Sequence, residues 1–242
     1  MAFFAIAAIA AGQPTPADVG KAIGPHSVRP PIGDADRRPT DSPAQAAARA
    51  LLETRGQPRM VAPTYYGASG PPREIDGKTE TVGIDIVDTY GDQAFPPEQL
   101  AIVGSVIDAN SYLSVTRDFV YSDFNVKVEE VLRQDKGDTV RAGDTLTTWR
   151  RGGAIRFGSG HVMDFVTSGK GFPITGERYV FFLWGRWPDM HGRYEISTAY
   201  QLTGGVAQGL DRAFSGYDNV PEEQFPETVK AAIASPKTSP KK

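Results

Sequence analysis

The chain has 242 residues, of which 40% are hydrophobic and 23% charged, and its formal net charge is −3. The apolar share is slightly below that of an average globular protein, which indicates that part of the chain lies outside a packed core. Proteins that bind nucleic acid usually carry a basic face, so the acidic balance argues against that class. The absence of cysteine excludes disulfides, thiolate metal sites, cysteine nucleophiles and a lipid anchor on cysteine.

The N-terminal segment has the pattern of a secretory signal peptide. Residues 3–11 form an unbroken apolar run, and within it Ala8-Ile9-Ala10 is a small-x-small pattern suited to signal peptidase. The run is far shorter than the roughly 20 residues that span a bilayer, so no transmembrane span is predicted. No Lys or Arg precedes the run, and the alternative is an apolar stretch in a disordered tail. We expect residues 1–12 to be the remnant of a signal peptide and the protein to be periplasmic or secreted.

Residues 13–79 have the composition of a disordered linker. Eleven of the 19 prolines fall between Pro14 and Pro72, and proline removes backbone donors. One helix is predicted at about 42–55, where Ser42 is a suitable N-cap and Pro43 suits the first helical position. Its apolar face is thin, so we favour a fluctuating helix over a segment that docks on a partner.

Residues 80–216 carry a succession of strand patterns and are predicted to form one all-β domain, a small OB-like barrel or sandwich. Residues 100–107 are almost continuously apolar, as in a strand covered on both faces, and residues 194–202 alternate between apolar and polar. Alternation along residues 124–128 slips at Glu129 and Glu130, which predicts a β-bulge. Glycine-containing turns separate these strands and no helix is predicted among them.

A short helix ending near Ala234 and a disordered basic tail are predicted for residues 217–242. Pro226 must lie in the first turns of this helix, where proline is tolerated, or break it.

The order of these elements resembles the netrin-like module, the OB-type barrel of the tissue inhibitors of metalloproteinases and of bacterial exported proteins. The resemblance covers residues 100–205 and rests on four segments: 102–106, 126–133, 142–146 and 176–183. It implies a barrel fold and an extracytoplasmic setting. The inhibitors bind the zinc of their target through an N-terminal cysteine, which this chain lacks, so the resemblance does not imply inhibition of metalloproteinases.

Motifs for catalysis, metal binding and cofactor binding are absent from the sequence, so we predict no cofactor, no metal and no catalytic residues. His161 with Asp164, joined by Asp189 and His191, is a possible metal or proton-transfer group, and an extracytoplasmic hydrolase built on it is the alternative function. We favour solvated histidines in turns. Gly158-Ser159-Gly160 is interpreted as a hairpin turn. Glu129 and Glu130 are a poor catalytic pair, because neighbours on a strand point to opposite faces.

Aromatic residues surround the hairpin at residues 185–192. Trp184, Trp187 and Tyr194 are candidate binding residues together with His161 and His191, since exposed aromatic rings bind sugars or protein partners. A packing role for the aromatic residues is the interpretation we favour.

The predicted function is therefore an exported, non-catalytic interaction or ligand-binding module. Its expected partner is an envelope or secreted protein or a glycan. Binding of single-stranded nucleic acid by an OB-type barrel is a further, less favoured alternative. The sequence does not predict an oligomeric state.

Overall fold

The computed structural model describes residues 30–55, 81–84, 100–115, 117, 120–135, 139–167, 169–185 and 193–234, excluding the side chains of residues 48, 51–55, 81–84, 167, 212, 213 and 215. The predicted signal segment and the basic tail lie outside these residues. The elements, in chain order, are β1 (Ile32–Asp34), α1 (Pro43–Arg55), β2 (Thr81–Ile84), β3 (Leu100–Leu113), β4 (Val120–Arg133), β5 (Thr145–Arg151), β6 (Gly153–Arg156), β7 (Val162–Thr167), β8 (Arg178–Trp184), β9 (Arg193–Thr203), β10 (Val206–Gly209), the 3₁₀ helix η2 (Arg212–Tyr217) and α2 (Phe225–Ala234).

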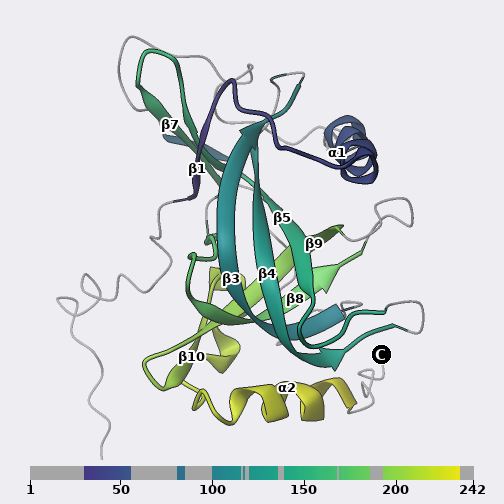
Figure 1. Cartoon of the computed structure of the whole chain (residues 1–242). Coiled ribbons are helices and arrows are strands. Elements are labelled where there is room, and N and C mark those ends of the chain that lie inside the picture. Colours follow the sequence, from purple (N-terminus) through teal and green to yellow (C-terminus); the bar gives the residue numbers. More distant parts are fainter. Residues whose placement is uncertain are drawn as a thin grey trace, which may run out of the picture.

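Five strands close into a barrel, which confirms the predicted fold class. The neighbours around it are β3, β4, β5, β9, β8 and again β3 (Figure 1). Only the β5–β9 contact is parallel; the other four are antiparallel. If the five are counted along the chain, the order is first, second, third, fifth, fourth, which is the order of OB-type barrels.

The long strands β3 and β4 are coiled by irregularities in their pairing. Val103 lies opposite Glu130 and Gly104 opposite Val128, so Glu129 is an extra residue in β4. This is the bulge that the slipped alternation predicts. Gly104 is needed here, because a Cβ atom at this position would lie 2.7 Å from the carbonyl oxygen of Lys127.

The two largest described clusters of buried hydrophobic residues lie on opposite sides of the barrel sheet, and a smaller one lies where β1 and β6 meet the ends of β3 and β4. Alternate residues of β3 explain this: Leu100 and Ile102 face the barrel interior with Phe124 and Phe181. Ala101 and Val103 face outward, where η2 and α2 cover them through Phe214, Phe225 and Val229. The nearly continuous apolar run is thus covered on both faces along residues 100–104, as predicted, whereas Ile107 at its end is 52% exposed. The sequence analysis missed η2, because one turn of 3₁₀ helix gives no hydrophobic period.

Segments that precede the barrel in the chain pair with the hairpin β6–β7. β1 adds in parallel to β6, and β2 adds in parallel to β7. Gly158-Ser159-Gly160 forms the turn of this hairpin, as predicted, and the amide of Phe157 donates to the carbonyl of His161 across it. β1 lies so close to β3 that a Cβ atom on Gly33 would overlap the carbonyl oxygen of Ser111.

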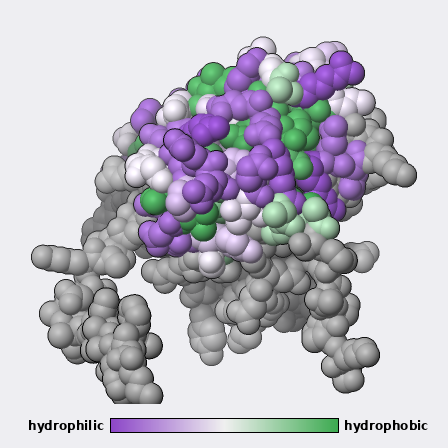
Figure 2. Space-filling model, turned by 90° about the horizontal axis from the view of Figure 1, so that it is seen from below, coloured by the Kyte–Doolittle hydropathy of each residue, from purple (hydrophilic) through white to green (hydrophobic). Residues whose placement is uncertain are grey.

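The two α-helices lie at opposite ends of the molecule (Figure 1). α2 buries Phe225 and Val229. Figure 2 shows the molecule from below, and hydrophilic residues cover most of the described part of this face, with hydrophobic residues between them. α1 lies beside the ends of β3 and β4 that are distant from α2 (Figure 1), and its described contacts with the barrel are polar.

Candidate binding face

The helix α1 is positioned by a local capping motif. The hydroxyl of Ser42 accepts a hydrogen bond from the amide of Gln45 (3.4 Å), and the side-chain oxygen of Gln45 accepts one from the amide of Ser42 (2.9 Å). This reciprocal pair satisfies two backbone donors at the start of the helix. The sequence predicts the helix and its N-cap. It gives no sign of where the helix lies.

Arg49 attaches α1 to the barrel. Its Nη1 atom donates to Asp123 Oδ2 (2.8 Å) and to the hydroxyl of Tyr121 (3.0 Å), both on β4. Its Nε and Nη2 atoms donate to the two carboxylate oxygens of Asp41 at 2.5 and 2.9 Å. Arg49 is only 8% exposed, so this guanidinium group is enclosed by ionic and polar partners instead of water.

Two tyrosine rings complete the enclosure of Arg49. Tyr112 on β3 lies directly opposite Tyr121 on β4, so both side chains share the outer face of the barrel. The guanidinium carbon of Arg49 is 5.0 Å from the ring centroid of Tyr112 and 5.7 Å from that of Tyr121. These distances allow cation–π attraction, which is stronger when the pair is shielded from water.

A second arginine balances the charge of Asp123. Arg193, the first residue of β9, donates from Nη2 to Asp123 Oδ1. Its Nε atom is buried and has no hydrogen-bond partner among the described residues. With Asp41 and Arg49 in place the cluster holds two positive and two negative side chains, and the barrel by itself supplies one of each. Because Asp123 and Arg193 already neutralise each other, the segment that covers them can itself be neutral overall.

The environment shifts the pKa values of both carboxyl groups. The hydrogen bonds from Arg49 lower the pKa of Asp41 below its usual range. Burial raises the pKa of Asp123, while the adjacent guanidinium groups of Arg193 and Arg49 act against that rise. Asp41 is thus held in the charged form that pairs with Arg49.

We call Tyr112, Tyr121, Asp123, Trp149 and Arg193 the binding face. Trp149 on β5 lies opposite Asp123 in the strand register and is 7% exposed. The sequence analysis names Trp184, Trp187, Tyr194, His161 and His191 as candidate binding residues and missed all five residues of the binding face. Polar Asp123 and Ser122, which break the apolar pattern of β4, and the single charge in the alanine-rich start of the helix were the only available signals.

A different buried pair, Arg150 with Asp211, has a structural role. Arg150 donates to the carboxylate of Asp211 and to the carbonyl of Gly171 (2.6 Å), and Asp211 accepts from the amide of Gly171 (3.0 Å). Both side chains are 3% exposed. The pair connects β5 to two loops of the barrel.

The histidines of the alternative hydrolase site are not seen together. His161 immediately precedes β7 and is half-buried, and Asp164 is the third residue of that strand, opposite Ala154 of β6. His191 and Asp189 lie outside the described residues. In the described part of the chain, no cluster of three or more His, Asp or Glu side chains is suited to a metal ion.

The predicted aromatic group is divided between two faces of the sheet. Trp184 lies opposite Glu195 in the register of β8 and β9, whereas Tyr194 packs on the barrel interior. Trp187 lies outside the described residues. Tyr194 thus has the packing role that the sequence analysis favours, because it packs against the interior core of the barrel.

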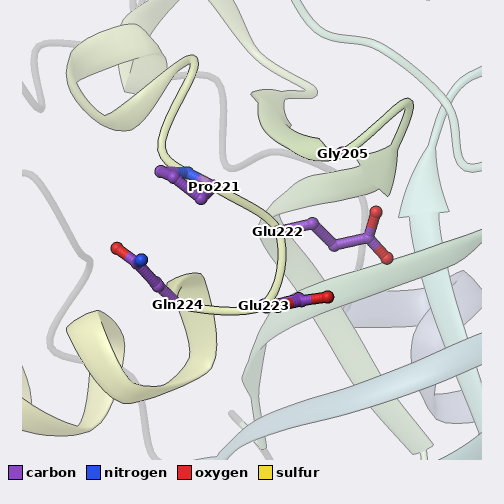
Figure 3. A pocket seen from close by; sticks show the side chains of 5 residues that line it. All are labelled: Gly205, Pro221, Glu222, Glu223 and Gln224. Carbon is purple, nitrogen blue, oxygen red and sulfur yellow. The ribbon is translucent and has the colours of Figure 1, made fainter.

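The adjacent glutamates also separate, each into its own ion pair. Glu129 accepts hydrogen bonds from Ser105 and Arg178, and Glu130 pairs with Lys230 of α2 at 2.6 Å. An open hollow beside this region is lined by Gly205 and residues 221–224, and its side chains point in different directions (Figure 3). It contains no enclosed polar group comparable to those of the binding face.

The comparisons leave the chain without an assigned family. No protein-family model matches the sequence, and no curated protein matches it significantly. Within the described residues, no helix is both long enough and apolar enough to cross a membrane. The class defined by the structure is thus an OB-type barrel with a covered face on β3, β4, β5 and β9.

Proposed function

We propose that this protein is an exported, non-catalytic interaction module that binds a partner protein through the binding face. One observation carries the proposal: the face already holds a helical segment from another part of the chain through Arg49, in a pocket of two tyrosine rings and a carboxylate. OB-type barrels commonly bind ligands on the face of their second and third strands, which are β4 and β5 here. The apolar N-terminal run and the resemblance to netrin-like modules support an extracytoplasmic setting.

Export is tested by fractionating cells that produce the native protein and sequencing the N-terminus of its mature form. An extracytoplasmic protein that begins just after Ala10 would support the proposal. A cytoplasmic protein with an intact N-terminus would contradict this part of it.

Binding is tested by cross-linking in intact cells, with wild-type protein compared with Asp123→Asn. Asp123→Asn keeps the shape of the side chain and removes the charge at the centre of the face. Asp108→Asn, on an exposed position of β3, is the matched control. We expect a specific cross-linked partner for wild type and the control that is lost with Asp123→Asn. Equal cross-linking of all three proteins would show that binding, if any, uses another surface.

A further inference from the structure

The contacts of α1 show what the binding face selects. Residues 43–47 and 50 of the helix are exposed, and among the side chains described in α1 only Arg49 is buried. The described part of the helix therefore presents no apolar surface to the barrel. Among the described side chains of α1, one guanidinium group makes the attachment to the barrel, and such an attachment is more easily displaced than a packed apolar face.

The barrel contacts one edge of the guanidinium group and places two tyrosine rings against it, with ring centroids 5.8 Å apart. Nη1 is shared between Asp123 Oδ2 and the Tyr121 hydroxyl, and the rings of Tyr112 and Tyr121 lie within cation–π distance. The opposite edge, formed by Nε and Nη2, donates hydrogen bonds to Asp41, which lies in the same segment just before α1. A planar group with several fixed donors can satisfy both edges and contact the rings at once, whereas the ammonium group of lysine cannot.

We infer that the binding face recognises an arginine on a helical segment of a partner protein, and that α1 occupies the same place as an intramolecular competitor. This inference rests on the proposed function and names the chemistry of its partner. Asp41 further specifies that a carboxylate belongs to the incoming segment, because the barrel supplies none to the second edge of the guanidinium group.

The test uses the full chain and a labelled peptide of residues 38–55. In the Arg49→Ala variant the chain's own helix lacks its attachment, so the face becomes accessible. Binding of the peptide is measured by fluorescence anisotropy, in parallel with peptides that carry Lys or Ala in place of Arg49. Circular dichroism verifies that the barrel of the variant is folded. Arg156→Ala serves as the matched control, because Arg156 is an exposed residue of β6 that pairs with Asp34 of β1 and does not belong to the face.

We expect the Arg49→Ala chain to bind the arginine peptide at least ~10-fold more tightly than the Lys or Ala peptide. Wild type and Arg156→Ala should bind it at least ~10-fold more weakly than Arg49→Ala, because the tethered helix competes at a high effective concentration. Equal affinity for the three peptides, or equal affinity of all three chains, would overturn the inference.

Two further results keep the inference separate from the proposed function. Should Arg49→Ala fail to fold, Asp41→Asn replaces it, because this variant weakens the helix attachment and leaves the barrel residues unchanged.

Arginine-selective binding of the peptide without any cross-linked partner in cells would support the inference and contradict the proposed function. A cellular partner that requires Asp123, with peptides bound equally, would support the function and overturn arginine recognition.

Discussion

The buried arginines Arg49 and Arg150, two of the three among the described residues, differ in what can relax around the partner carboxylate when the arginine is removed. Deleting one partner of a buried ion pair costs about 3–5 kcal/mol when the remaining charge stays enclosed. Asp211 is enclosed by the barrel itself, whereas Asp123 is enclosed partly by α1, which can move away and admit water. The position of an arginine in the fold thus decides its contribution to stability.

We therefore expect Arg150→Ala to lower the free energy of unfolding of the barrel by about 3–5 kcal/mol. Arg49→Ala should lower it by clearly less, because release of the helix restores water to Asp123. Urea unfolding followed by circular dichroism measures both. An equal loss in the two variants would mean that α1 is an integral part of the barrel core.

The pKa of Glu129 makes a further prediction at the scale of a residue. Although its partial burial acts to raise it, hydrogen bonds from Ser105 and Arg178 hold this pKa below its ordinary value. A carboxylate whose pKa is lowered in the folded state stabilises that state above the unfolded pKa, about 4.3, and the contribution disappears as the pH falls through the folded pKa.

Glu129→Gln is accordingly expected to reduce stability at pH 7 by at most about 1 kcal/mol, because the side chain is partly solvated. At pH 3 the variant and wild type should approach equal stability. Thermal unfolding at both pH values is the measurement. A difference that grows toward low pH would contradict the assigned hydrogen bonds.

At the scale of an element, α1 and α2 are attached by opposite means. α2 inserts Phe225, whose ring centroid is 4.8 Å from that of Tyr200 and 6.4 Å from that of Tyr217. α1 inserts a charged group. Apolar burial is non-directional and strong, while the attachment of α1 depends on a few hydrogen bonds in fixed positions.

Phe225→Ala is predicted to cost about 3–5 kcal/mol, because it removes a fully buried aromatic ring from the outer core layer. Ala232→Gly on the exposed side of α2 is the control and should cost about 1 kcal/mol. Chemical denaturation compares the two. A loss for Phe225→Ala that does not exceed the control would show that α2 is dispensable for the barrel.

The sequence predicts the elements better than the site, for a physical reason. Strands of the barrel alternate in hydrophobicity or are apolar throughout, and even the bulge at Glu129 leaves a slip in that pattern. The binding face combines residues of β3, β4, β5 and β9, and its occupant comes from a segment whose composition is that of a linker. A single arginine among alanines has the pattern of a solvated charge, and only the fold shows that Asp123 lies beside it.

At the scale of the whole molecule, the chain before the barrel contributes two edge strands and one helix to the described structure. β1 and β2 flank the hairpin β6–β7, and α1 covers the binding face. A segment that covers a site in this way sets its apparent affinity, because any partner must first displace it. The proposed module would thus combine a binding surface and its own competitor in one chain.

Amide hydrogen exchange of the full chain tests the central claim most directly, since that claim is that Arg49 holds α1 on the binding face. Amides of residues 46–55 should be protected in wild type and exchange at nearly unprotected rates in Arg49→Ala, while β3, β4 and β8 keep their protection. Equal protection of the helix in both proteins would contradict the claim, because other contacts would then hold it. Absence of protection in wild type would show that the face is open and that α1 does not occupy it.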